Sequence, residues 1–177
     1  MKYVDPDGRE DSDIEIVRSW IYEASYFIIN HQSDEIDQMI AEKLIQMLNE
    51  GRVQIDDVTK RYETKNHPGH SKNVFAYFDP FFNTETNENR NIIVIDINKT
   101  IETGLSELID TLTHEIWHAI QFDLGLITVD DNNVIHFYPN KNKIENDSNY
   151  LGVKMYNKYA AENNLPLKIF LEEIQQE

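Results

Sequence analysis

The chain has 177 residues and a mass of 20.8 kDa, which is the size of one domain, and 40% of its residues are hydrophobic, enough to bury a core. Its 16 Lys and Arg residues against 32 Asp and Glu residues give a net charge of -16, which disfavours binding to nucleic acids and to anionic membrane surfaces. Cysteine is absent, so disulfides, thiolate nucleophiles and cysteine zinc sites are excluded. Any metal site must therefore use His, Asp and Glu.

The N-terminal residues 1–13 are acidic and rich in turn formers. We expect them to form a flexible tail that precedes a single domain over residues 14–177. A secretory signal would be basic and then apolar at this position, so the sequence favours a cytoplasmic protein. No stretch of the chain approaches the roughly 18 consecutive apolar residues that a membrane-spanning helix needs.

Two helices are predicted after this tail. Apolar residues recur at helical spacing from Ile14 to about Ile29, which indicates an amphipathic helix. A second helix is expected from the capping residues Ser33 and Asp34 onward, because its apolar stripe continues up to the stop signal at Gly51. These helices precede the first region with a strand-like pattern.

Strands are predicted in the middle of the chain. Apolar and polar residues alternate and then mix over residues 53–62, and a turn-rich stretch at 66–71 separates this region from a second strand at 74–78. The polar residues 83–91 are expected to form a loop. Residues 92–97 are mostly β-branched with few polar side chains, which is typical of an interior strand covered on both faces.

The second half of the chain is predicted to be mainly helical. A long helix is expected at 105–122, closed by Gly125, and a short strand at 134–138. A last helix is expected at about 148–163, followed by a helical turn or tail at 167–176. The order of elements predicts an α+β fold with N-terminal helices, one small mixed sheet, a central helix and a C-terminal helix.

The predicted central helix carries His114, Glu115 and His118 in an H-E-x-x-H arrangement. At about 100° per residue, the two histidines lie about 40° apart on the polar face, opposite the apolar face of the helix. Two imidazoles one turn apart can bind one Zn²⁺ through their ring nitrogens. Glu115 is displaced by about 100° from His114, so it can act as a general base on a water molecule at the metal.

This arrangement resembles the zincin metallopeptidases. The longer string from His114 to Gln121, H-E-x-x-H-A-x-Q, looks like that of small bacterial and phage zincins of the gluzincin-like kind. The resemblance covers about residues 53–122, and it implies a zincin-like fold, peptide-bond hydrolysis and Zn²⁺ as the cofactor. It also implies that residues 74–78 form the edge strand that pairs with the substrate backbone, and that residues 92–97 form the interior strand beside it.

Catalytic zinc takes three protein ligands, so one ligand must come from outside the helix. Phe122 and Leu124 stand where two longer zincin motifs have a third histidine, which excludes a metzincin. Small zincins of the kind that the chain resembles have a Tyr, five residues and then a Glu on a later helix. Tyr156 and Glu162 fit this pattern, so the resemblance implies Glu162 as the third ligand, although Leu165 replaces the usual small residue.

Three further residues could supply the third ligand in place of Glu162. His136 follows the motif on a predicted strand, and Glu145 and Asp147 come just before the last predicted helix. A half-buried strand histidine is the ordinary interpretation of His136, and a solvated helix residue is the ordinary interpretation of Glu162.

Further polar residues could support the site. Asp110 and Gln121, one turn before and after the histidines, could hydrogen-bond the imidazoles or only line the polar face. His67 and His70 flank a Pro-Gly pair and are better explained by a polar turn than by metal binding. Three tyrosines on the last predicted helix could donate to an oxyanion or pack in the core: Tyr150, Tyr156 and Tyr159.

The main hypothesis is a zinc metallopeptidase with His114, His118 and Glu162 as metal ligands and Glu115 as the general base, acting on a peptide or protein substrate. A second hypothesis is a catalytically inactive zincin-like binding module. A third is an acidic protein that inhibits a basic partner through its net charge. The acidic composition is compatible with basic peptide substrates and with a role in solubility alone.

Overall fold

The computed structural model describes residues 11–58, 75–83, 88–89 and 91–170. Within them the helices are α1 (Asp11–Asn30), α2 (Glu35–Asn49), α4 (Ile97–Thr103), α5 (Leu105–Asp123) and α6 (Lys141–Glu162). The strands are β1 (Val53–Asp56), β2 (Ala76–Asp79), β3 (Phe82–Asn83), β4 (Glu88–Asn89), β5 (Ile92–Asp96), β6 (Ile127–Val129) and β7 (Ile135–Phe137). The prediction of an α+β fold is confirmed.

The main sheet has three strands in the order β1-β5-β2. β5 runs parallel to β1, with Val53 opposite Ile93, and antiparallel to β2, with Ala76 opposite Ile95. The sheet is therefore mixed, as predicted, with β5 in its middle and β2 at one edge. All five residues of β5 are buried, which confirms the prediction of an interior strand.

The side chains of β5 alternate between two apolar clusters. Ile93 and Ile95 join the main core, which α1, α2 and α5 share with the sheet. Ile92 and Val94 point to the other face and pack with Val58. This double burial explains why the sequence of β5 lacks the polar alternation of a strand with one solvated face.

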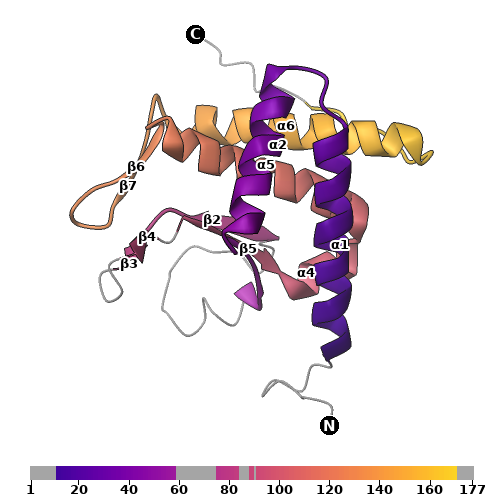
Figure 1. Cartoon of the computed structure of the whole chain (residues 1–177). Helices are drawn as coiled ribbons and strands as arrows, with labels where there is room; N and C mark the ends of the chain where they lie inside the picture. The colour runs from indigo at the N-terminus through magenta and orange to yellow at the C-terminus, as the bar shows by residue number, and fades with distance from the viewer. Residues whose placement is uncertain (1–10, 59–74, 84–87, 90, 171–177) are drawn as a thin grey trace.

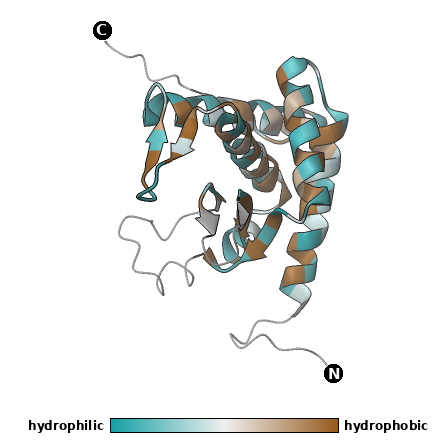
Figure 2. Ribbon diagram, turned by 60° about the vertical axis from the view of Figure 1, so that its left-hand side comes forward, coloured by the Kyte–Doolittle hydropathy of each residue, from teal (hydrophilic) through white to brown (hydrophobic). Residues whose placement is uncertain are grey.

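The helices form a layer in which α5 is central. α5 and α6 lie side by side and run in opposite directions, while α1 and α2 cross them at a steep angle (Figure 1). Hydrophobic residues are dense on α5 in the interior, and polar residues cover the outer faces of the surrounding helices (Figure 2). The buried face of α5 includes Leu108, Ile109, Leu112, Ile116, Ala119 and Ile120, so its predicted amphipathic division is confirmed.

A short helix that the sequence interpretation missed, α4, follows β5 directly. The Asp96 carboxylate caps it by accepting from the Lys99 backbone N–H at 2.8 Å. Gly104 separates α4 from α5 at φ 86°, a conformation that favours glycine. α4 therefore turns the chain from the end of the sheet into the central helix.

Several predicted boundaries were wrong. α1 begins at Asp11, inside the expected acidic tail, and α6 begins at Lys141 rather than near residue 148. Residues expected to form a loop contribute the short pair β3–β4, and β7 pairs with the unpredicted β6 in a hairpin. The described strands therefore form three sheets instead of one. Residues 165–170, which include part of the expected final turn, have no regular secondary structure.

Other predictions lie outside the described residues. These are most of the tail at 1–13, the continuation of the first strand to residue 62, the turn at 66–71 with His67 and His70, and the end of the chain from residue 171. Among the helices that the structure does describe, none has the length and apolarity required to cross a membrane.

Candidate metal centre

His114 and His118 project from one side of α5 toward the start of α6, where Glu145 meets them. The Glu145 Oε2 atom lies 3.5 Å from His114 Nε2 and 3.5 Å from His118 Nε2. The imidazole rings are nearly perpendicular, with centroids 4.6 Å apart. Two nitrogens and one carboxylate oxygen from two helices thus converge on one point.

These spacings fit a tetrahedral metal site. Ligand atoms placed about 2.0 to 2.1 Å from Zn²⁺ at tetrahedral angles lie about 3.3 to 3.4 Å from one another. Both 3.5 Å separations in the structure are close to that edge length. An ion could therefore bind between Glu145 and the two histidines with small side-chain adjustments.

Gln121 orients the His118 ring. The Gln121 Nε2 group donates to the Ile144 carbonyl at 3.1 Å, which leaves Gln121 Oε1 to accept from His118 Nδ1 at 2.8 Å. The buried Ser148 hydroxyl also donates to Gln121 Oε1, at 3.2 Å. With its proton held on Nδ1, His118 presents the Nε2 lone pair to a metal. The hydrogen bond to an imidazole that was considered for Gln121 in the sequence is confirmed by this contact.

Glu115 is buried beside the histidines. Its Oε1 lies 4.0 Å from His114 Nε2, and potential ligand atoms of His114, Glu115 and His118 all lie within 4.8 Å of one another. These three residues form a group that could hold a metal ion. Because Glu145, unlike Glu115, approaches both imidazoles at 3.5 Å, it fits the third-ligand position better than Glu115 does.

The local charges favour an ionised Glu145. Burial by itself would raise the pKa of Glu145, but the hydrogen bonds from His114 and His118 outweigh it and hold this pKa well below its usual range. Burial by itself would lower the pKa of His118, but the contact with Glu145 and the charge of Glu115 raise it. His118 and the Glu145 carboxylate thus stabilise each other's charged forms.

The structure does not bring Glu162, the third ligand implied by the resemblance, to this cluster. Glu162 lies at the other end of α6, about 25 Å along the helix from Glu145 at 1.5 Å per residue. Its Oε1 contacts His31 Nε2 at 2.7 Å, and its side chain is 57% exposed. The Tyr-to-Glu spacing thus pointed to an acid on α6 that lies far from the histidine pair.

His136 and Asp147 also lie apart from the histidine pair. His136 Nε2 contacts Asp130 Oδ2 at 2.7 Å on the exposed side of the β6–β7 hairpin. Asp147 is on α6 but contacts Lys143 Nζ at 2.7 Å. Among the third-ligand candidates from the sequence, only Glu145 approaches both histidines.

The remaining candidate residues have structural contacts. Asp110 does not hydrogen-bond an imidazole, because its carboxylate contacts Lys168 Nζ at 2.6 Å. Tyr156 and Tyr159 pack in or against the core, as the simpler interpretation predicted, whereas Tyr150 is half exposed and contacts the Phe170 ring. None of the three tyrosines lines the two cavities beside the histidines.

A helix-start signal in the sequence could have identified Glu145. Asn140 caps α6, with its Oδ1 accepting from the Lys143 backbone N–H at 2.9 Å. The buried residues Ile144, Leu151 and Met155 continue the helical spacing from this cap. Starting the helix at this cap places the carboxylate of Glu145 one turn before Ser148, on the side that faces α5.

Gly152 allows α6 to approach α5 near the site. A methyl group at this position would overlap the Asp110 carboxylate and lie 2.9 Å from the Asp110 carbonyl oxygen. Only glycine therefore fits at this crossing without displacing a backbone. The short distance between the helices is what brings Glu145 within reach of the histidines.

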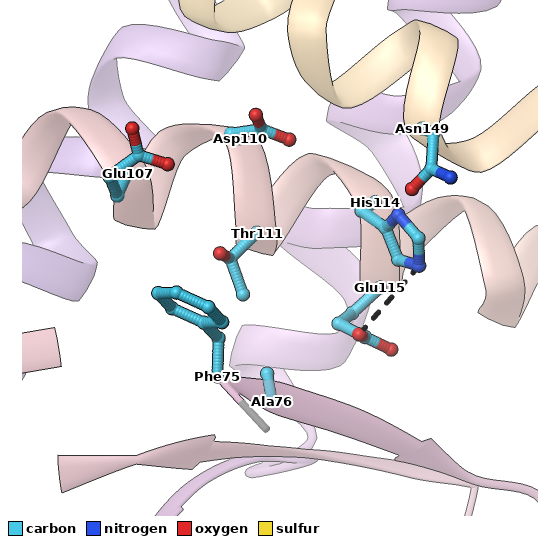
Figure 3. Close-up of a pocket in the computed structure, with 8 residues that line it drawn as sticks. All are labelled: Phe75, Ala76, Glu107, Asp110, Thr111, His114, Glu115 and Asn149. Carbon is cyan, nitrogen blue, oxygen red and sulfur yellow. Dashed lines mark ion pairs between the residues drawn. The ribbon is translucent and has the colours of Figure 1, made fainter. Parts of the chain in front are cut away.

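Two cavities meet at the candidate centre. The acidic cavity, of about 290 Å³, lies between α5 and the start of β2 and is lined by Phe75, Ala76, Glu107, Asp110, Thr111, His114, Glu115 and Asn149 (Figure 3). The apolar cavity, of about 350 Å³, is lined by Ala76, Tyr77, Phe78, Pro80, His114, Glu115, His118, Ile127, Ile135, Phe137, Lys141 and Glu145. Because Ala76, His114 and Glu115 line both cavities, they form one cleft along β2.

Comparisons of the chain with protein-family models, with curated proteins and with solved structures found no match.

Proposed function

We propose that the protein is a zinc metallopeptidase with a zincin-like fold, in which His114, His118 and Glu145 hold the metal and Glu115 is the general base. The observation that carries this proposal is the convergence of two imidazole nitrogens and Glu145 Oε2 at 3.5 Å, with a buried carboxylate beside them. Two histidines and one carboxylate are a ligand set of catalytic zinc sites that leave a coordination position open.

The chain supplies the acid–base group for hydrolysis. When bound, zinc supplies a Lewis acid that polarises a peptide carbonyl and makes a water molecule more acidic. Glu115, 7% exposed and facing the cleft, accepts a proton from the attacking water and delivers it to the leaving amine. Gln121 holds the His118 ring in place during these steps.

The edge strand β2 provides a means of holding a peptide. β2 pairs with β5 along one side, and its residues Ala76, Tyr77 and Phe78 line the cleft. An extended peptide can add to a sheet edge through backbone hydrogen bonds and thereby place a carbonyl near the metal ligands. This arrangement agrees with the edge-strand role that the resemblance implied for residues 74–78.

The first test is metal analysis of the purified protein, followed by peptidase assays. We expect about one zinc per chain, which His114→Ala and Glu145→Ala lose and Glu162→Gln retains. Glu115→Gln should retain the metal and lose peptide hydrolysis by at least about 100-fold, because the general base is removed. Glu102→Gln, at an exposed acid on α4, is the matched control.

The outcomes separate an active peptidase from an inactive module. Zinc binding with equal hydrolysis by the wild type and Glu115→Gln would exclude the proposed mechanism. Zinc bound without hydrolysis of any peptide or protein substrate would favour the inactive binding module. Absence of zinc after reconstitution would exclude both the metallopeptidase and a zinc-dependent module.

A further inference from the structure

The two cavities beside the candidate centre differ in chemical character. Phe78 from β2 and Ile127, Ile135 and Phe137 from the β6–β7 hairpin form apolar walls in one of them. The opposite end of the cleft presents the carboxylates of Glu107 and Asp110, which the chain's own Lys168 contacts. A peptide lying along β2 would therefore meet an apolar surface on one side of His114 and an acidic surface on the other.

The apolar cavity has fixed walls. The hairpin is tied to the end of α5 because the Leu126 backbone N–H donates to the Gln121 carbonyl at 2.9 Å, and the Tyr138 N–H donates to the Leu126 carbonyl at 2.8 Å. Ile127 is only 4% exposed, and Phe137 is half-buried facing it across the strand pair. A volume of about 350 Å³ accommodates a large aliphatic or aromatic side chain.

The acidic cavity already contacts an ammonium group from the same chain. Lys168 Nζ lies 2.6 Å from Glu107 Oε2 and 2.6 Å from Asp110 Oδ2, and 4.2 Å from the centre of the Tyr156 ring. Asn157 accepts from the Lys168 backbone N–H at 2.8 Å and donates to its carbonyl at 3.0 Å. The side chain of Lys168 is thus held by the two carboxylates of this wall, and its backbone is held by Asn157.

The charge at this wall is not balanced. Within the part of the chain that the structure describes, two carboxylates share one ammonium group, so one negative charge remains on a surface that lines the cavity beside His114 and Glu115. Glu107 and Asp110 keep 33% and 17% of their side-chain surface exposed. A second cation can therefore approach them from the cleft, and it competes with Lys168 for the same oxygens.

We propose that the cleft selects extended peptides in which a large apolar residue is followed two positions later by a basic residue, with the apolar side chain under the hairpin and the basic side chain at Glu107 and Asp110. The spacing is two because both cavities lie on the α5 side of β2, and alternate side chains of an extended peptide share one face. This inference rests on the proposed peptidase function. The order of the two residues in the peptide follows from the direction of β2. This strand runs from Phe75, which lines the acidic cavity, toward Pro80, which lines the apolar cavity. A peptide added antiparallel, the more stable pairing, runs from the apolar to the acidic cavity.

The test is peptide binding to Glu115→Gln, measured by fluorescence anisotropy with and without Zn²⁺. The probes are labelled octapeptides that differ only at two central positions separated by one alanine: Phe-Ala-Lys, Phe-Ala-Ala, Ala-Ala-Lys, Ala-Ala-Ala and Lys-Ala-Phe. We expect Phe-Ala-Lys to bind at least about 10-fold more tightly than Ala-Ala-Ala and more tightly than Lys-Ala-Phe. Phe-Ala-Ala and Ala-Ala-Lys should have intermediate affinities.

Variants of the two walls separate their contributions. Phe137→Ala should remove the preference for phenylalanine and keep the preference for lysine. The double variant Glu107→Gln with Asp110→Asn should do the reverse. Val134→Ala, on the exposed hairpin turn, and Glu102→Gln are the matched controls. Lys168→Gln should increase affinity for the lysine peptides severalfold, a gain that misfolding cannot produce.

Equal binding of all five peptides, tighter binding of Lys-Ala-Phe than of Phe-Ala-Lys, or no gain with Lys168→Gln would overturn the inference. Peptide binding does not require turnover, so a protein without peptidase activity still gives a decisive result. Conversely, hydrolysis that depends on Glu115 but shows no sequence preference would preserve the proposed function and reject this specificity.

Discussion

At the residue scale, Gln121 determines which nitrogen of His118 faces the candidate metal. Its side chain accepts from His118 Nδ1 and donates to the Ile144 carbonyl, so it joins α5 to the first turn of α6. The whole Gln121 side chain is buried, with 1% exposure. A water molecule therefore cannot easily replace this contact, which is the shorter of two that orient the ring, because the Ser148 hydroxyl lies 3.2 Å from the same nitrogen.

Replacement of Gln121 by alanine is expected to weaken zinc binding by about 10- to 100-fold, because the His118 ring loses its orienting acceptor. Competition with a chromophoric chelator measures this affinity. Gln121→Glu keeps an acceptor for Nδ1 and should bind zinc more tightly than Gln121→Ala does. Equal zinc affinities for the wild type and Gln121→Ala, with both proteins folded by circular dichroism, would contradict the orienting role.

The sequence was informative about residues whose relation is set within one helix. His114, Glu115 and His118 lie on α5, where helical geometry alone brings them together, and the structure shows the predicted grouping. Which acid lies beside the two histidines depends instead on how α6 packs against α5. The sequence contains many acids and does not state this packing, so the pattern of the family that the chain resembles favoured Glu162 over Glu145.

At the element scale, the closeness of α5 and α6 depends on Gly152. Alanine is the better helix former by about 1 kcal/mol, so propensity alone would make Gly152→Ala stabilising. The added methyl would meet the Asp110 backbone carbonyl at 2.9 Å, and a backbone cannot rotate away as a side chain can. Overpacking of this kind typically costs about 1–3 kcal/mol.

We expect Gly152→Ala to reduce the free energy of unfolding by about 1 kcal/mol or more and to weaken zinc binding, because α6 must move away from the histidines. Urea denaturation and the chelator assay measure the two effects. Asn142→Ala, at an exposed position of the same helix, should change the free energy of unfolding by less than about 0.5 kcal/mol. An unchanged or increased stability of Gly152→Ala would contradict the close helix crossing.

Long elements with a clear apolar period were predictable, whereas short ones were not. α2, β5 and α5 have apolar patterns that decide their type without tertiary contacts. β6 and β7 have only three residues each, and they exist because the hairpin pairs them. α4 depends on the Asp96 cap at the end of a buried strand, so its apolar residues resemble a continuation of that strand.

At the scale of the whole molecule, Asp37 links the first two helices to the last one. Its carboxylate accepts from the Ser33 hydroxyl at 2.7 Å and from Lys158 Nζ at 2.5 Å, and it is 1% exposed. Burial by itself would raise the pKa of Asp37, but the hydrogen bonds from Lys158 and Ser33 lower it to about 2. The folded state therefore favours the ionised carboxylate more than the unfolded state does.

Because folding lowers the pKa of Asp37, the contribution of its carboxylate to the free energy of unfolding depends on pH. Relative to an ordinary value of 3.8, a folded-state pKa of about 2 corresponds to about 2 kcal/mol of stability, which is present above pH 4 and is lost as the pH falls toward 2. Asp37→Asn should therefore be less stable than the wild type by about this amount at pH 7, and the difference should shrink near pH 2.

Urea unfolding of the wild type and Asp37→Asn across this pH range measures the difference. Glu42→Gln, at an exposed acid of the same helix, is the control and should show little pH-dependent difference from the wild type. A stability difference for Asp37→Asn that does not change between pH 7 and pH 2 would contradict the assignment of an ionised, ion-paired Asp37.

Metal binding should stabilise the whole fold if α5 and α6 share the ion. At a free zinc concentration of 100 times the dissociation constant, the gain is about 2.7 kcal/mol, or roughly 5 to 10 °C in Tm for a chain of this size. Differential scanning fluorimetry with Zn²⁺, and with Mg²⁺ for comparison, measures it. Glu145→Gln should reduce the shift strongly, whereas Glu162→Gln should retain it; the reverse pattern would restore Glu162 as the ligand.

The proposed ligands and the proposed specificity walls belong to different kinds of structure. His114, His118 and Glu145 stand on two packed helices, whereas the apolar walls come largely from the β6–β7 hairpin, which lies between those helices in the chain. The hairpin can therefore change in length and sequence while the helix pair keeps its geometry. Exchange of the β6–β7 hairpin, in evolution or by protein engineering, could therefore change which peptides bind in the cleft without moving the proposed metal ligands.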